Sequence, residues 1–117
     1  MNLKLVLAGA TIAACTSAVA ASTDDDQYPW VMGVGAGSCG KLLTAERENS
    51  KLGMQIYVTW TQGYLSGVNF VKDKQAKNLR TDPDTILAYL LKHCHDKPLD
   101  EIYTVVGALI VDLSVKN

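Results

Sequence analysis

The segment that decides the fold class is residues 54–71, which read MQIYVTWTQGYLSGVNFV. Large apolar and aromatic residues recur in it every three or four positions, at Tyr57, Trp60, Tyr64, Val68 and Val71. That spacing places them along one face of an α-helix, and the alternation that a half-buried strand would need is absent. The sequence therefore predicts a helix over about residues 54–73, with these side chains facing the core.

Two glycines, Gly63 and Gly67, lie four residues apart inside this predicted helix. Each costs about 1 kcal/mol in a helix interior relative to alanine. We therefore predict that both face a neighbouring helix at a close crossing, where Gly67→Leu would overpack the contact by about 1–3 kcal/mol or more. Core packing is the preferred interpretation of Trp60 and Tyr64, and a cofactor-binding pair is the alternative.

A shorter helix is predicted before this one. Ser38 is a suitable N-cap for a helix over residues 39–49, whose apolar positions fall near one face. Ser50-Lys51-Leu52-Gly53 is then predicted to break or bend the chain.

Two more helices are predicted after it. Asp82 fits the N-cap and Pro83 the first position of a helix over residues 83–95. Pro98 is predicted to begin a helix over residues 98–115, whose apolar residues form the wide stripe of a core-facing helix. Together the four helices predict a small all-α domain.

The first twenty residues have a composition of their own. Lys4 is followed by an apolar run and then by Ala18-Val19-Ala20, which is a small-x-small cleavage site. This layout predicts a secretory signal peptide over residues 1–20, and hence a periplasmic protein. Two alternatives stay open: a membrane helix, and a lipoprotein signal in which Cys15 is the lipid acceptor.

Residues 21–37 are predicted to be a flexible leader to the helical domain, which spans residues 38–117. The leader combines a run of three aspartates with Gly33, Gly35 and Gly37. A phosphate-binding loop is the alternative interpretation of these glycines, but their spacing does not fit and the lysine of a P-loop is missing.

The cysteine count predicts one disulfide. Both export routes remove or consume Cys15, so the mature domain keeps Cys39 and Cys94. An even pair in a small exported domain indicates a disulfide between them. The closed loop is long, so the bond is worth about 4 kcal/mol in the chain-entropy model.

The charge balance argues against a nucleic-acid partner. The chain has 11 basic and 12 acidic residues, so no positive excess is available to neutralise phosphates. A basic cluster lies between the second and third predicted helices, at Lys72, Lys74, Lys77 and Arg80. These residues are either a solvated linker or a contact surface for an acidic partner protein, and we treat them as the candidate partner contact.

No arrangement of residues predicts catalysis. The acidic residues are scattered, a glycine-flanked nucleophilic serine is absent, and a disulfide would consume the cysteines that could act with a histidine. His93 and His95 flank Cys94, but side chains two positions apart on a helix point about 200° apart and do not readily share a metal ion. We expect a protein that is not an enzyme and that needs neither a metal nor a cofactor.

The predicted helices also carry a recognisable pattern. Its residues are Ser38-Cys39-Gly40, Tyr57, Trp60, Gly63-Tyr64, Ser66-Gly67, Asn69, Asp84, Leu87, Tyr89-Leu90, Cys94 and Pro98-Leu99. This set resembles the Rap/Tai-type immunity protein family over about residues 38–115. A polar asparagine would suit the position before Pro98, where this chain has Lys97.

The resemblance implies a small, exported, all-helical protein with one disulfide that neutralises a type VI secretion amidase effector in the periplasm. We accordingly expect an inhibitor that presents loops to the active-site cleft of a peptidoglycan amidase. The nearest alternative is an HdeA-like acid-stress chaperone, because those proteins are also small, helical and periplasmic with one disulfide. A homodimer is open in either case.

Overall fold

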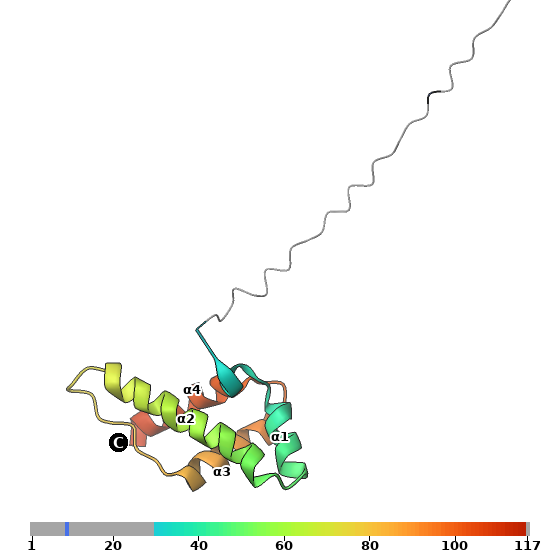
Figure 1. The fold of residues 1–117 in the computed structure, drawn as a ribbon. Coiled ribbons are helices and arrows are strands. Elements are labelled where there is room, and N and C mark those ends of the chain that lie inside the picture. Colours follow the sequence, from blue (N-terminus) through green and yellow to red (C-terminus); the bar gives the residue numbers. More distant parts are fainter. Residues whose placement is uncertain (1–8, 10–29, 117) are drawn as a thin grey trace, which may run out of the picture.

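A computed structural model describes Gly9 and residues 30–116. The predicted signal peptide, Cys15 and the leader up to residue 29 lie outside the described residues. A short 3₁₀ helix is followed by four α-helices: η2 (Gly33–Ala36), α1 (Cys39–Arg47), α2 (Lys51–Val71), α3 (Pro83–Asp96) and α4 (Ile102–Lys116). Over residues 30–116 the one strand-like pairing is an isolated bridge between Ser38 and Glu101. The predicted all-α domain of four helices is therefore confirmed (Figure 1).

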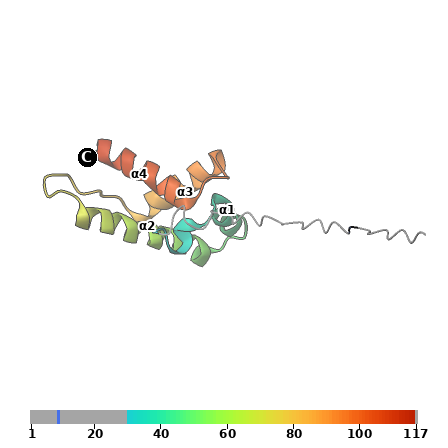
Figure 2. The same cartoon turned by 90° about the horizontal axis from the view of Figure 1, so that it is seen from above.

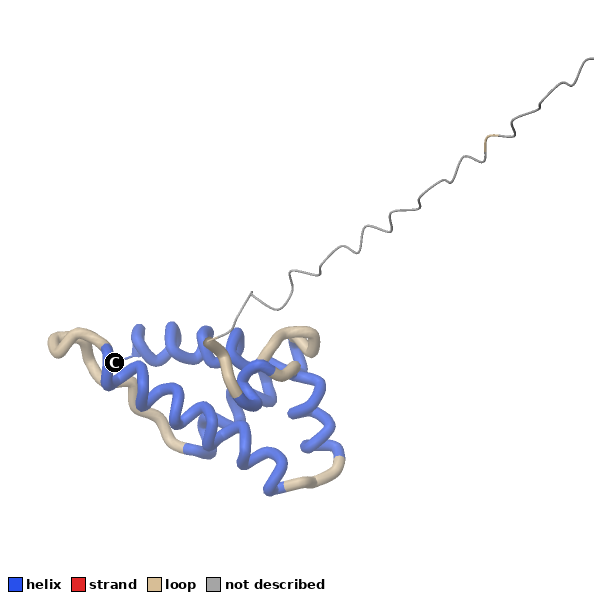
Figure 3. Tube along the Cα trace, turned by 45° about the horizontal axis from the view of Figure 1, so that its top comes forward, coloured by secondary structure: helices blue, strands red, loops and turns tan. Residues whose placement is uncertain are grey.

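The long helix α2 runs along the domain. The loop that joins α2 to α3 projects at one end, and α1 lies at the other (Figures 1 and 2). The end of α4 lies on the same side as the projecting loop, as the tube view also shows (Figure 3). The loop therefore stands away from the disulfide-linked part of the domain.

The predicted disulfide is present. Cys39 and Cys94 are bonded, and their Cα atoms are 5.1 Å apart. The bond joins the first residue of α1 to the last turn of α3, and both cysteines are fully buried. Leu42, Leu90 and Ile102 belong to the same buried cluster, so the bond lies inside the core.

Two helices begin at residues other than those predicted. α2 begins at Lys51, because the Ser50 hydroxyl accepts a hydrogen bond from the Gly53 backbone N–H at 3.0 Å. The segment predicted to break the chain is thus the cap of α2. α4 begins at Ile102, and the prediction that Pro98 opens it was wrong, since Pro98 lies in the preceding turn.

Backbone pairing between distant segments explains the late start of α4. The N–H of Cys39 donates to the carbonyl of Asp100 at 2.8 Å, and the N–H of Ile102 donates to the carbonyl of Gly37 at 2.9 Å. The first N–H groups of α1 and α4 have no partner within their own helices. The residue two positions before each of these helices therefore supplies the acceptor for the first N–H of the other, which brings the two helix starts together.

The start of α3 agrees with its prediction. The Asp82 carboxylate accepts from the Thr85 backbone N–H at 2.8 Å, and Pro83 is the first helical residue. A hydrogen bond from the Thr85 hydroxyl, together with this one from the Thr85 backbone, lowers the pKa of Asp82. The remaining helix ends differ from prediction by one or two residues.

The buried face of α2 differs from the predicted one. Its buried residues are Tyr57, Val58, Thr61 and Leu65. Thr61 is buried, and its hydroxyl keeps a hydrogen-bond partner because it donates to the Tyr57 carbonyl at 2.8 Å. Val71, predicted to face the core, is 78% exposed. The core face is therefore shifted from the predicted stripe and not separate from it. Tyr57 is buried as predicted, and Trp60, Tyr64 and Val68 are partly buried against the core.

The prediction for the two glycines of α2 was wrong. Both Gly63 and Gly67 are exposed, and a Cβ added at either position would have no neighbouring atom within 4 Å. Neither residue lies at a helix crossing within the domain. Gly67→Leu should therefore not overpack the monomer.

The prediction of a flexible leader was wrong for its last part. Residues 30–37 are described, and they pack on the domain: Val31 is 8% exposed and Gly35 is buried. A Cβ on Gly35 would come within 1.9 Å of the Trp60 ring. Gly35 therefore lets this segment pack closely against the Trp60 ring. Neither a flexible leader nor a phosphate-binding loop predicts this contact.

Candidate functional site

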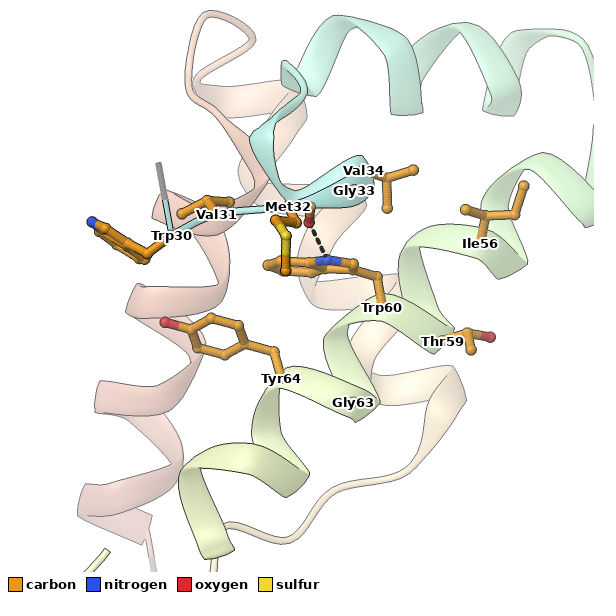
Figure 4. Close-up of a pocket in the computed structure, with 10 residues that line it drawn as sticks. All are labelled: Trp30, Val31, Met32, Gly33, Val34, Ile56, Thr59, Trp60, Gly63 and Tyr64. Carbon is orange, nitrogen blue, oxygen red and sulfur yellow. Dashed lines mark hydrogen bonds between the residues drawn. The ribbon is translucent and has the colours of Figure 1, made fainter. Parts of the chain in front are cut away.

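An apolar cleft with a volume of about 600 Å³ lies between residues 30–34 and α2 (Figure 4). Residues 30–34 cross over α2, and side chains from both segments form its walls. The lining consists of Trp30, Val31, Met32, Gly33, Val34, Ile56, Thr59, Trp60, Gly63 and Tyr64.

Trp60 holds the two walls of the cleft together. Its indole N–H donates to the carbonyl of Met32 at 2.8 Å, across 28 residues of sequence. Its ring stacks on Tyr64, with centroids 5.2 Å apart and an angle of 29° between the planes. Trp60 and Tyr64 thus pack against the core, as predicted, and both also line the cleft.

The cleft offers apolar contact and little else. Among the described residues that line it, the one ionisable side chain is Tyr64. General acid–base chemistry needs a positioned proton donor or acceptor with a partner that tunes it. The arrangement is therefore suited to holding an apolar or aromatic group, rather than to transferring a proton.

The outward face of α2 continues from the cleft and is uncharged. No charged residue occurs between Lys51 and Lys72. Ile56 and Phe70 lie on this face and are 48% and 90% exposed. A surface helix normally carries charged or polar residues on its solvent side. This face is therefore a candidate contact surface for another macromolecule.

The four predicted contact residues lie in the α2–α3 loop. Lys74, Lys77 and Arg80 are exposed, while Lys72 is half-buried and its ammonium group donates to the carbonyl of Ala76. The loop thus carries three exposed basic residues, and the ammonium group of Lys72 holds a turn within it. They lie near the C-terminal end of α2, whose partial negative charge they complement.

Asn69 clamps this loop to α2. Its side-chain amide donates to the Leu79 carbonyl at 2.9 Å, and its oxygen accepts from the Leu79 N–H at 2.8 Å. The Leu79 side chain is buried beside them, at 9% exposed. Asn69 was part of the sequence pattern, but its role as a clamp needs a contact ten residues away that no local signal indicated.

The two histidines contact different carboxylates. His93 Nε2 lies 2.9 Å from a carboxylate oxygen of Asp100, and His95 Nε2 lies 2.7 Å from one of Glu46. They therefore diverge, as the helical spacing predicted. In residues 30–116, no group of three or more His, Cys, Asp or Glu side chains is arranged to hold a metal ion.

No protein-family model, curated protein or solved structure matches this chain. Every helix in the described part of the chain is too short or too polar to span a membrane.

Proposed function

We propose that this protein is an exported inhibitor that binds a peptidoglycan amidase effector of a type VI secretion system in the periplasm and occludes its active-site cleft. The export signal expected at residues 1–20 and the resemblance to Rap/Tai-type immunity proteins motivate the identity of the target. The observation that carries the binding role is the clamped basic loop over residues 72–82.

The loop has the properties of a recognition element. It projects from one end of the domain (Figure 1), and it exposes Lys74, Lys77 and Arg80. Because Asn69 and buried Leu79 hold its backbone, less conformational entropy is lost when a partner binds than for a free loop. An acidic rim around a partner's cleft would complement the loop in charge.

Charge reversal of the loop should slow the encounter with the target. For the triple variant Lys74→Glu, Lys77→Glu, Arg80→Glu, we expect the association rate with the target amidase to fall about tenfold or more at low ionic strength. The difference should shrink as salt rises. Stopped-flow or biosensor kinetics at several salt concentrations would measure it.

The matched control reverses three exposed lysines on other elements, in the variant Lys41→Glu, Lys92→Glu, Lys116→Glu. It changes the net charge equally, so it separates the position of the charge from its amount. Equal slowing by both triple variants would reject the loop as the contact surface. The circular dichroism of each variant checks that the fold is kept.

The target itself is tested in cells. An exported amidase encoded beside this gene would be expressed in the periplasm with and without the protein, and lysis would be followed. We expect rescue by the mature protein and a stoichiometric complex on co-purification. Lysis that continues, together with no detectable complex, would overturn the proposed inhibition.

A second candidate function is an HdeA-like acid-stress chaperone, which the exposed, uncharged face of α2 favours. Such a chaperone would suppress light scattering by an acid-denatured client near pH 2 and not at neutral pH. Suppression at pH 2 without any effect on the amidase would select this function over inhibition.

A further inference from the structure

The outward face of α2 combines a projection and a hollow of matching chemistry. The projection is Phe70, which is 90% exposed in the last turn of the helix. The hollow is the apolar cleft, lined from α2 by Ile56, Thr59, Trp60, Gly63 and Tyr64. A cavity of about 150 Å³ accommodates a benzene ring, so a cleft of about 600 Å³ has ample room for a phenylalanine side chain.

The two features are spaced so that one face can pair with itself. Phe70 and Trp60 lie on opposite sides of the level of residue 65, each about 7.5 Å along the helix axis at 1.5 Å per residue. Gly63 and Gly67 lie symmetrically about the same level. In an antiparallel pair of α2 helices, Phe70 of the partner subunit would face Trp60, and the partner's Gly67 would face Gly63.

We infer that the outward face of α2 binds a second copy of this chain, with the two α2 helices antiparallel about a two-fold axis level with residue 65. Each cleft then receives Phe70 of the partner subunit. The contact is isologous, so it closes after two copies. The open space above Gly63 and Gly67 lets the two helix backbones approach closely.

The exposed apolar area of this face is large enough for a specific interface with a second copy. Phe70 is 90% exposed, and Trp30, Met32 and Ile56 at the cleft are 61%, 77% and 48% exposed. Taking about 150–250 Å² for a fully exposed aromatic side chain, the four offer on the order of 500 Å² per copy. Two copies would bury about 1,000 Å², which is the size at which a specific interface begins.

Charge selects the antiparallel arrangement. Within α2 the nearest charged residues are at the ends of this face, because none occurs between Lys51 and Lys72. An antiparallel pair separates the two Lys72 residues by about 20 Å along the axis, which is beyond the Debye length of about 8 Å at physiological salt. A parallel pair would place the two basic loops together. With the axis level with residue 65, the start of each basic loop at residue 72 lies level with residue 58 of the partner subunit. The inference rests on the outward face of α2 and not on the proposed inhibition.

Sedimentation velocity of the mature protein between about 1 and 100 μM tests the pairing. We expect a dimer, and we expect Phe70→Asp to raise the dissociation constant at least 100-fold. Gly67→Leu should have a similar effect while the thermal melt of the monomer stays intact, because its Cβ meets nothing in the domain. Leu99→Asp is the matched control, since Leu99 is equally exposed but lies outside α2.

A cysteine pair tests the register. Ser66 and Ser114 are exposed serines on α2 and α4 whose hydroxyls donate to the carbonyl four residues before them. Ser66 lies one residue from the proposed axis, so Ser66→Cys should form an intermolecular disulfide under mild oxidation and Ser114→Cys should not.

Three results would overturn the inference. The first is a wild-type protein that stays monomeric at 100 μM. The second is a dimer that persists in both Phe70→Asp and Gly67→Leu, or that Leu99→Asp disrupts as strongly. The third is a dimer in which Ser66→Cys does not cross-link.

Discussion

Replacing Cys39 by alanine is expected to lower the free energy of unfolding by about 4 kcal/mol. The bond to Cys94 closes a loop with a sequence separation of 55 residues, which restricts the unfolded chain. For a domain of this size, about 4 kcal/mol corresponds to a fall of about 15–30 °C in Tm. Thermal and urea unfolding followed by circular dichroism would measure it under non-reducing conditions.

The double variant Cys39→Ala, Cys94→Ala is the matched control. Both sulfurs are fully buried, so both variants lose similar packing as well as the covalent link. Its Tm should lie close to that of the wild-type protein in strong reductant. A single variant as stable as the oxidised parent would contradict the role of the bond in stability.

The ends of helices were predictable where the signal is local and not where it is distant. Asp82 and Pro83 mark the start of α3 because an N-cap acts over three residues. Pro98 is equally compatible with a first helical turn and with a loop. What decides between them is the hydrogen bond from Ile102 to the carbonyl of Gly37, which no local pattern reveals.

The helical period of α2 was predictable, but its orientation was not. Apolar residues occupy most of its circumference, so a stripe through Tyr57, Trp60 and Tyr64 fits the period as well as the true core face does. The core face shares Tyr57 with that stripe, but its other buried residues include Leu65 and Thr61, whose hydroxyl is satisfied within the helix. A sequence rule that expects charged residues outside fails on a helix whose outer face is uncharged and includes exposed apolar residues such as Phe70.

The candidate site was only partly predictable for the same reason. Lys72, Lys74, Lys77 and Arg80 were identified as a cluster because they are close in sequence, and they do share one loop. The cleft joins residues 30–34 to α2, and its central contact is a backbone carbonyl at Met32. Every residue has a backbone carbonyl, so the identity of Met32 could not indicate that its carbonyl accepts this hydrogen bond.

The second large effect is expected for Gly35→Ala, which tests how the cleft is built. The new Cβ would come within 1.9 Å of Cζ2 and 2.2 Å of Cη2 of Trp60, well inside van der Waals contact. Either residues 33–36 lift away from α2 or the indole turns, and both movements strain or break the hydrogen bond from Trp60 to the Met32 carbonyl. We expect a loss of about 1–3 kcal/mol in unfolding free energy.

The readout should separate a local effect from a general one. In a Trp30→Phe background, fluorescence reports Trp60 alone, and Gly35→Ala should shift its emission to longer wavelength as the indole gains solvent. Gly107→Ala is the matched control: Gly107 lies inside α4 and a Cβ there meets no atom within 4 Å. Because alanine is the better helix former by about 1 kcal/mol, that variant should be more stable than the parent. If Gly35→Ala is likewise stabilising and leaves the Trp60 emission unchanged, the segment before α1 does not press on the indole and the cleft has no fixed wall.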